Sequence, residues 1–294
     1  MARFSTSRRR FCAAVASLGT LPVASSVIAG DAPRAGRARP RVAVCFGSGA
    51  LHGYAHVGAI NAFERHGFKP DVICGTSVGA IVGVLWAAGL DADRINDLAS
   101  DDELFTLGLP RLSMFGPGKL TELSDFLEEQ TGGRRIEALP TVFACVATDL
   151  DSGRMVTLKS GSAARVVVAS ASMPLRYEPV VIGQRRLVDG ALTAPVPIDA
   201  ARELGADFII GIDVAYRPYE EPVDDFDDVP FQMFHIMVNH LIAEQLRRAD
   251  MSIRMDVHEI MRDSDDMTLL IRAGEAAVEK AWPGLERHLR QPSG

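Results

Sequence analysis

Cysteine is scarce in this chain. The 294 residues include only four, Cys12, Cys45, Cys74 and Cys145, and no two of them form a Cys-x-x-Cys pair. The last three lie in apolar, strand-like runs, where a cysteine behaves as a small buried residue. The cysteine pattern therefore indicates neither a disulfide framework nor a metal site, and we predict no cofactor.

Basic residues are also fewer than acidic ones. The sequence contains no internal repeat. The chain has 31 Lys and Arg against 38 Asp and Glu, a net charge of −7, and no basic cluster recurs after the N-terminal segment. Nucleic-acid binding depends on a concentrated basic surface. The composition therefore excludes nucleic acid as a partner.

No apolar run is long enough to span a membrane stably, and the nearest candidate is at the N-terminus. There a basic segment, Ser7–Phe11, precedes a mildly apolar stretch, residues 12–29, that is rich in Ala, Ser and Gly. An arginine pair before an apolar stretch that ends in small residues resembles a twin-arginine export signal. We therefore predict a signal over residues 1–29, a linker over 30–40, and export to the periplasm or cell envelope of a bacterium. A disordered basic tail is the alternative.

From Arg41 onward the pattern is that of one large α/β domain. An apolar run at 41–46 leads into a glycine loop, a helix that ends at Gly67, a second apolar run at 71–74 and another helix. Continuous apolar strands separated by helices predict a parallel sheet covered on both faces. The fold class expected is therefore α/β, with a parallel-rich central sheet flanked by helices on both faces.

The rest of the chain extends the same pattern. We predict strands at 141–147, 154–158, 180–182, 186–191 and 207–214, a short strand at 252–257, and helices at 163–173, 195–205, 231–251 and 274–289. Residues 220–230 are predicted to be a mobile loop. The apolar, breaker-rich stretch 104–118 fits either a loop packed over the core or a lid. Residues 41–215 would form the main domain, with 216–294 a helical extension packed on it.

One strand-to-helix turn carries a candidate nucleophile. Gly75-Thr-Ser77-Val-Gly79 follows an apolar strand and precedes an apolar helix. In such a G-x-S-x-G elbow the two glycines permit a sharp turn that exposes the serine hydroxyl at a helix N-terminus. Ser77 is therefore the predicted nucleophile, although a glycine-rich turn can also be purely structural.

The glycine loop at residues 47–53 has three interpretations. A dinucleotide fingerprint is disfavoured because the spacing is G-x-G-x-x-x-G and no acidic residue ends the second strand. A structural turn is the second. The third is an oxyanion hole, in which bare backbone N–H groups beside Ser77 face the carbonyl oxygen under attack.

Two aspartates are further candidates. Asp149 lies in a hairpin turn, where a turn-forming role for its side chain is favoured over an acid role. Asp189 ends an apolar strand beside Gly190, which is consistent with either a functional side chain or a turn aspartate. His235, His240, His258 and His288 are the downstream histidines that a Ser-Asp-His triad would need, and none follows a predicted core strand.

Five segments in this order resemble the patatin-like phospholipase family: the loop 47–53, Gly75–Gly79, Val146–Asp149, Ala169–Pro174, and Val188–Gly190 followed by Pro195–Pro197. The resemblance implies a Ser-Asp dyad with Ser77 as nucleophile and Asp189 as base, supported by Gly75, Gly79 and Gly190. It also implies an oxyanion hole formed by Gly47, Ser48, Gly49, Ala50, Leu51, His52 and Gly53.

The same resemblance implies hydrolysis of phospholipid or other lipid acyl esters, and contact with a membrane surface. Two positions depart from the family pattern. His52 replaces the usual Arg or Lys, and Val168 replaces an Arg, so fixed positive charge near the site is lost. The alternatives are a non-catalytic lipid-binding or scaffold protein and an esterase with a Ser-Asp-His triad.

Overall fold

The computed structural model describes residues 39–100, 120–215, 229–255, 257, 260 and 266–290. The predicted export signal, most of the linker, the stretch 104–118, and residues 220–228 of the predicted mobile loop lie outside these ranges. Val229 and Pro230 are described and belong to a helix, so the predicted loop ends earlier than expected.

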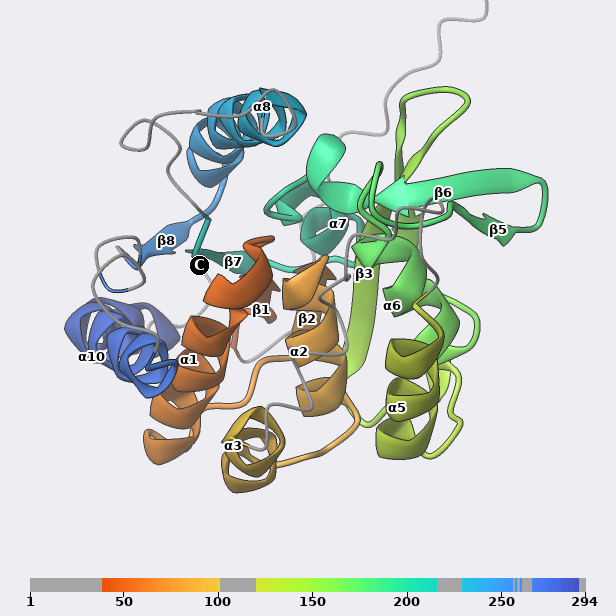
Figure 1. Cartoon of the computed structure of the whole chain (residues 1–294). Helices are drawn as coiled ribbons and strands as arrows, with labels where there is room; N and C mark the ends of the chain where they lie inside the picture. Colours follow the sequence, from red (N-terminus) through yellow and green to blue (C-terminus); the bar gives the residue numbers. More distant parts are fainter. Residues whose placement is uncertain are drawn as a thin grey trace, which may run out of the picture. The chain divides into compact units, whose positions relative to one another are not determined.

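One mixed sheet organises the described residues (Figure 1). Its strands are β1 (Val42–Phe46), β2 (Val72–Thr76), β3 (Val142–Asp149), β4 (Met155–Leu158), β5 (Val180–Ile182), β6 (Arg185–Asp189), β7 (Phe208–Asp213) and β8 (Met251–Arg254). The order across the sheet is β5-β6-β3-β2-β1-β7-β8, and β4 pairs with β3 outside that path. The central strands β3, β2, β1, β7 and β8 are mutually parallel, whereas β4 and β6 pair antiparallel with β3, and β5 pairs antiparallel with β6.

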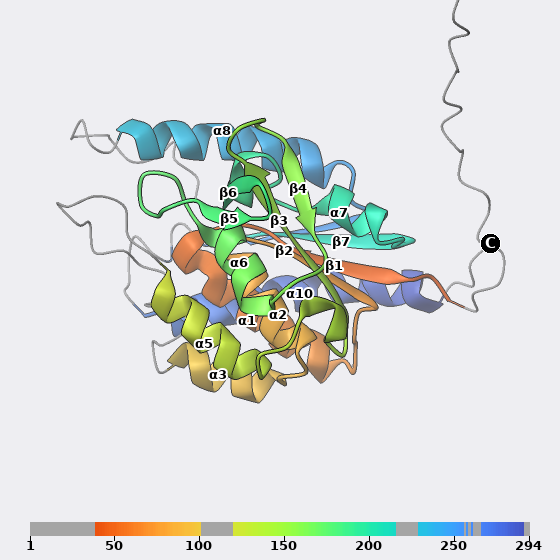
Figure 2. The same ribbon diagram turned by 90° about the vertical axis from the view of Figure 1, so that its right-hand side faces the viewer.

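Helices cover both faces of the sheet, as predicted (Figure 2). The described helices are α1 (Tyr54–Arg65), α2 (Val78–Ala87), α3 (Ala92–Ser100), α5 (Thr121–Thr131), α6 (Ala163–Ala171), α7 (Ile198–Glu203), α8 (Val229–Leu246) and α10 (Thr268–Arg290), with short 3₁₀ turns η1 (Ala50–Gly53), η2 (Ile136–Ala138) and η3 (Gly190–Leu192). Alternate residues of β1 enter different cores: Val44 and Phe46 pack with α1 and α2, Ala43 and Cys45 with α7 and α8. This alternation explains why β1 is apolar throughout.

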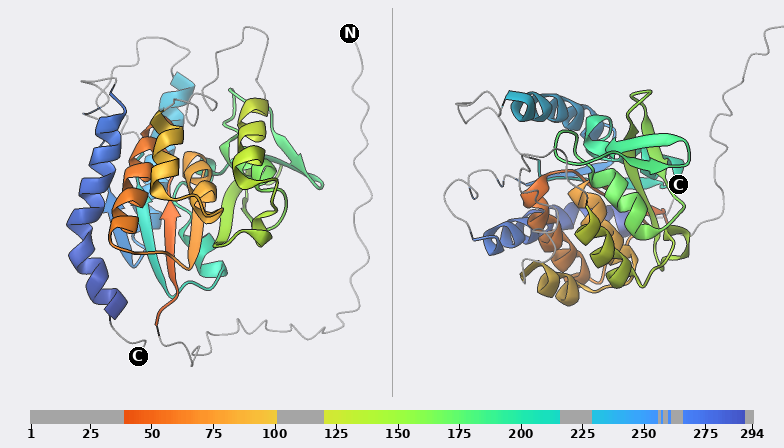
Figure 3. Two further views of the ribbon diagram at one scale, coloured as in Figure 1. Left: turned by 90° about the horizontal axis from the view of Figure 1, so that it is seen from below. Right: turned by 45° about the vertical axis from the view of Figure 1, so that its right-hand side comes forward.

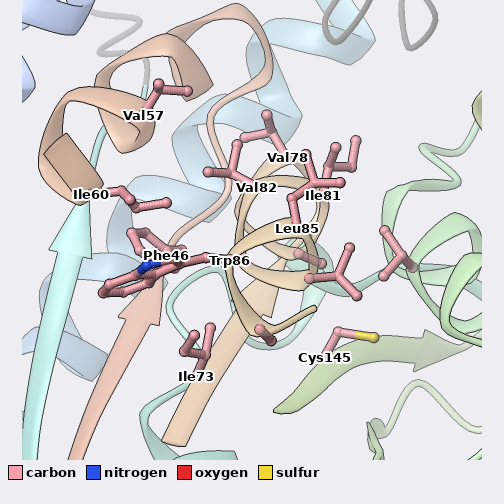
Figure 4. Close-up of a cluster of buried hydrophobic side chains, with 14 of the residues drawn as sticks. Phe46, Val57, Ile60, Ile73, Val78, Ile81, Val82, Leu85, Trp86 and Cys145 are labelled. Carbon is pink, nitrogen blue, oxygen red and sulfur yellow. The ribbon is translucent and has the colours of Figure 1, made fainter. Parts of the chain in front are cut away.

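Helix α2 lies in the larger core, and each of its residues is buried. Phe46 of β1 meets Trp86 of α2 edge-on, with ring centroids 6.1 Å apart, and Ile81, Val82 and Leu85 of α2 belong to the same buried cluster (Figure 4). A helix that is apolar on all sides is stable only when it is covered on all sides. The elbow that precedes α2 is therefore anchored to the most deeply buried helix of the domain.

Helix α10 packs against α1 at unusually close range (Figure 3). A Cβ atom added at Gly58 of α1 would overlap the carbonyl oxygen of Ile271, and one added at Gly274 of α10 would overlap that of Ala55. Two facing glycines let the helix backbones touch, so the C-terminal segment is an integral part of the main core.

We predict that Gly274→Ala destabilises the protein, because the helices must separate to admit the new methyl group. Thermal or urea unfolding should show a loss of about 2 kcal/mol, the usual range for overpacking. Gly284→Ala is the matched control in the same helix, since among the described residues its Cβ would approach only Met251 Cε, at 3.4 Å. That variant should be neutral or gain about 0.5–1 kcal/mol from helix propensity. Equal responses of the two variants would contradict the close crossing.

Local predictions outside the site can also be compared with the structure. Gly67 ends α1 with φ 67°, and its N–H donates to the Glu64 carbonyl. Asp149 Oδ1 accepts the N–H groups of Asp151 and Ser152, which confirms its role in the turn. Helix α10 begins at Thr268, six residues before the predicted start. No helix in the described ranges has the length and apolar character needed to cross a bilayer.

Candidate active site

The elbow has the strained backbone that its sequence pattern indicates. Ser77 lies between β2 and α2 with φ 55° and ψ −123°, a conformation that side-chain-bearing residues rarely adopt. A Cβ at Gly75 would overlap the Ala80 backbone, and one at Gly79 would overlap the carbonyl oxygen of Phe46. Both glycines are therefore required for the turn to fit against its neighbours.

Ser77 is directly hydrogen-bonded to Asp189. The Ser77 hydroxyl donates to Asp189 Oδ2 at 2.6 Å, and the N–H of Ala191 donates to Oδ1 at 2.8 Å. The aspartate is only 3% exposed. Burial raises the pKa of Asp189 to about 6, and the two hydrogen bonds partly offset that effect. A carboxylate with a pKa near neutrality can both accept and return a proton at physiological pH.

Asp189 is placed beside Ser77 by an antiparallel strand, not by a parallel one. Its strand, β6, runs antiparallel to β3, with Ala147 opposite Asp189. The rule that functional residues follow the carboxyl ends of parallel strands therefore does not apply to it. Instead β6 enters beyond the end of β3 and stops level with the end of β2. Gly190 is needed here because a Cβ would overlap the carbonyl oxygen of Val146.

Two hydroxyl groups that the sequence analysis did not single out position the pair. Ser170 of α6 accepts the Ser77 N–H at 3.0 Å and donates to the carbonyl of Val146 at 2.6 Å. Thr148 of β3 donates to the Asp189 carbonyl at 3.0 Å. These residues fall in the two family-like motifs 169–174 and 146–149, whose roles the sequence alone did not reveal.

The loop that follows Asp189 connects the parts of the site. The Thr76 hydroxyl donates to the Ala194 carbonyl at 2.7 Å, which ties the elbow to this loop. Gln245 of α8, a buried residue, donates from Nε2 to the Thr193 carbonyl and accepts the Val196 N–H at Oε1. Helix α8, from the C-terminal segment, therefore holds the loop that carries the aspartate.

Some residues of the predicted oxyanion hole have backbone N–H groups that already donate hydrogen bonds within the protein, and others do not. The N–H of Gly47 donates to Ile212 at 3.0 Å, that of Ser48 to Pro195 at 2.8 Å, and that of His52 to Gly49 at 3.0 Å. These three N–H groups therefore cannot also donate to an oxyanion, and fewer residues of the loop 47–53 remain as candidates for the oxyanion hole. Gly53 falls within η1 and α1 begins at the next residue, so its amide lies inside a helical turn.

The amides of Gly49, Ala50 and Leu51 make no backbone hydrogen bond within the described residues. They precede or begin η1, which places them with the free N–H groups of a helix start. A Cβ at Gly49 would crowd Val214, so this residue must also be glycine. The oxyanion candidates are thus reduced to residues 49–51, together with the N-terminal amides of α2.

Two histidines four residues apart lie at the end of this loop, His52 within it and His56 in the first turn of α1. His56 is fully buried, and its Nε2 donates to the Gly47 carbonyl at 2.7 Å. Burial lowers the pKa of His56 to about 4, so it is neutral at pH 7 and acts as a fixed brace for the loop. His52 is buried beside it. Among the described residues no group of three His, Cys, Asp or Glu side chains is arranged to hold a metal.

The other departure, Val168, is buried in α6, where its carbonyl accepts the Ser172 hydroxyl at 2.7 Å. Of the histidines considered for a triad, His235 and His240 lie on α8 and His288 on α10. His258 lies outside the described residues. The direct bond from Ser77 to Asp189 leaves no place for an imidazole between these two side chains.

A strained serine at a strand-to-helix elbow, bonded to a buried aspartate, defines an α/β protein with a nucleophile elbow. Residues 44–202, more than half of the chain, match the model of the family described as patatin-like phospholipase. The chain belongs to the patatin-like phospholipase family. It therefore carries a patatin-like phospholipase domain, as the motifs predicted.

The curated relatives agree with this assignment. An uncharacterised NTE family protein of Mycobacterium tuberculosis is 33% identical over 183 residues, 60% of this chain and 50% of the relative. Patatin-like phospholipase domain-containing protein 7 of Rattus norvegicus is 31% identical over 189 residues, 60% of this chain and 14% of the relative. The chain thus spans half or less of the length of these relatives.

Solved structures share the fold. The crystal structure of VipD from Legionella pneumophila aligns with a TM-score of 0.53 and 14% identity, over 86% of this chain and 67% of VipD. A chain of the structure of SpcU in complex with ExoU from Pseudomonas aeruginosa aligns with a TM-score of 0.51 and 15% identity, over 87% of this chain and 54% of that one. At such identities the likeness concerns the fold alone.

Proposed function

We propose that this protein is an exported serine hydrolase that cleaves acyl esters of phospholipids or other lipids through Ser77 and Asp189. The observation that carries the proposal is the 2.6 Å hydrogen bond from the Ser77 hydroxyl to a buried carboxylate. Membership of the patatin-like phospholipase family supports the substrate class. The basic and apolar segments at residues 7–29 support export to the periplasm or cell envelope.

The geometry supports a two-step acyl transfer. Ser77 Oγ attacks the ester carbonyl carbon while Asp189 Oδ2 takes the hydroxyl proton. The carbonyl oxygen becomes an oxyanion that the free amides of residues 49–51 and the N-terminus of α2 stabilise. The proton then passes from Asp189 to the leaving alcohol, and an acyl group remains on Ser77.

Water completes the cycle. Asp189, again ionised, accepts a proton from a water molecule that attacks the acyl-enzyme, and the fatty acid leaves as Ser77 regains its proton. The hydrogen bonds from Ala191 and from Thr148 hold the aspartate in place throughout. No third side chain is required, because the base already contacts the nucleophile.

The proposal is tested by turnover and by covalent labelling of the purified protein. We expect hydrolysis of a p-nitrophenyl acyl ester and of a phospholipid, and fluorophosphonate labelling at Ser77 identified by peptide mass spectrometry. A scaffold that has lost catalysis would show neither turnover nor labelling. Turnover that survives Asp189→Asn but is abolished by His235→Ala or His240→Ala would instead support a Ser-Asp-His triad.

A further inference from the structure

The N-terminal half of α8, residues 229–240, exposes large apolar side chains and contains no Asp, Glu, Lys or Arg. Val238 and Ile242 face the core and are buried, yet Met233 and Met237, on the opposite face, are 57% and 52% exposed. A helix on the surface of a globular domain normally presents polar residues outward. The exposed methionines therefore need another explanation.

Another exposed apolar residue belongs to a loop that contacts this helix. Leu175, in the loop after α6, is 70% exposed and has φ 71°. The next residue, Arg176, places its guanidinium 4.6 Å from the ring centroid of Phe231, in the first turns of α8. Val229, Met233 and Met237 follow one another at four-residue spacing on α8, and Leu175 lies in the loop that contacts its first turns through Arg176; we call these four residues the α8 patch.

Both segments that contribute to the α8 patch also make hydrogen bonds near Asp189. The loop that carries Leu175 begins at Ser172, whose carbonyl accepts the Asp189 N–H at 2.9 Å. The other end of α8 holds the loop after Asp189 through Gln245. Both segments that contribute to the patch are therefore hydrogen-bonded to Asp189 or to the loop that follows it, and the four patch residues are exposed.

A cation borders the α8 patch. Residues 163–177 and residues 229–240 contain no Asp or Glu, although Glu178 and the acidic run 220–228 adjoin these two segments in the sequence. The cation at the border is Arg176, whose Nε is buried without a hydrogen-bond partner in the described part of the chain. Apolar side chains that border an arginine complement a phospholipid surface, in which acyl chains lie beneath phosphates.

We propose that the α8 patch docks on a phospholipid surface and holds the mouth of the site against it. This inference rests on the proposed function, because it supplies the route by which a lipid ester would reach Ser77. Met233 and Met237 would enter the apolar boundary of the surface, and Arg176 would meet a phosphate.

The experiment compares the full-length protein with the double variant Met233→Gln/Met237→Gln. Co-sedimentation with phosphatidylcholine vesicles containing phosphatidylglycerol should show binding at least about tenfold weaker for the variant, from the lost apolar burial. Hydrolysis of phospholipid in those vesicles should fall similarly. Turnover of a soluble short-chain p-nitrophenyl ester, which needs no docking, should stay within about twofold.

Val142→Gln is the matched control, since Val142 is an exposed apolar residue, 42% accessible, at the amino end of β3. It should bind vesicles like the wild type. Equal vesicle binding by wild type and double variant would overturn the docking proposal. So would a dimer, seen by size-exclusion chromatography, that the double substitution dissociates without changing vesicle binding. Normal vesicle binding with no turnover of either ester would count against the proposed function alone.

Discussion

Replacing Ser77 with alanine should lower ester turnover by about three orders of magnitude or more, the scale expected when a nucleophile is removed. Alanine keeps the Cβ atom, so the backbone strain at φ 55° is unchanged and only the hydroxyl is lost. Asp189 then has no proton to accept from residue 77. Turnover of p-nitrophenyl esters and fluorophosphonate labelling should both disappear, while circular dichroism and the unfolding midpoint report an intact fold.

The matched control for this substitution is Ser152→Ala. Ser152 is exposed in the turn between β3 and β4 and contributes only its backbone N–H to the contact with Asp149. Its loss should leave labelling and turnover at wild-type levels. If Ser77→Ala retained activity, another residue would be the nucleophile. Labelling at Ser77 in a protein without turnover would show an activated serine whose substrate was not among the esters tested.

Much of the fold can be predicted from the sequence, because buried parallel strands have a distinctive composition. β1, β2, β3 and β7 are covered on both faces, so their sequences are continuously apolar and easily recognised. The start of α10 is harder to place. Its first residues are partly exposed, and its position depends on contact with Gly58 of a distant helix, which no local pattern encodes.

The site is less predictable, because several of its parts depend on tertiary contacts. The elbow pattern is local, and it identifies Ser77. Asp189, by contrast, is brought to the serine by an antiparallel strand, so the rule for the carboxyl ends of parallel strands does not explain its position. Ser170 and Gln245 act through hydrogen bonds to backbone groups far away in the sequence. Neither residue type signals such a role by itself.

Asp189→Asn should be inactive yet more stable than the wild type at pH 7. Asparagine can still accept the Ala191 N–H at Oδ1, but it cannot take the Ser77 proton, so turnover should fall by about three orders of magnitude. Burial raises the pKa of Asp189 from 3.8 to about 6. Holding that carboxylate ionised at pH 7 therefore costs the native state on the order of 3 kcal/mol, which the neutral side chain avoids.

The gain in stability should depend on pH in a defined direction. Between about pH 4 and pH 6 the native state retains a proton on Asp189 that the unfolded chain has released, so wild-type stability falls as pH rises through this window. Wild-type turnover should rise over the same window, with a midpoint near pH 6, because only the ionised form is a base. The advantage of Asp189→Asn, measured by urea unfolding, should be full at pH 7 and vanish near pH 4.

Asp213→Asn provides the matched control for this prediction. Asp213 also ends a strand, is 1% exposed, and accepts the N–H of the residue two positions on, Ala215, at Oδ1. It differs in facing a cation, since its Oδ2 lies 3.6 Å from Arg254 Nε. Neutralising it removes an ion pair, so this variant should lose stability at pH 7. If both variants gained similar stability at pH 7, the gain in Asp189→Asn would not be due to removal of a buried, unpaired charge. Ionisation of Asp189 would then not destabilise the native state.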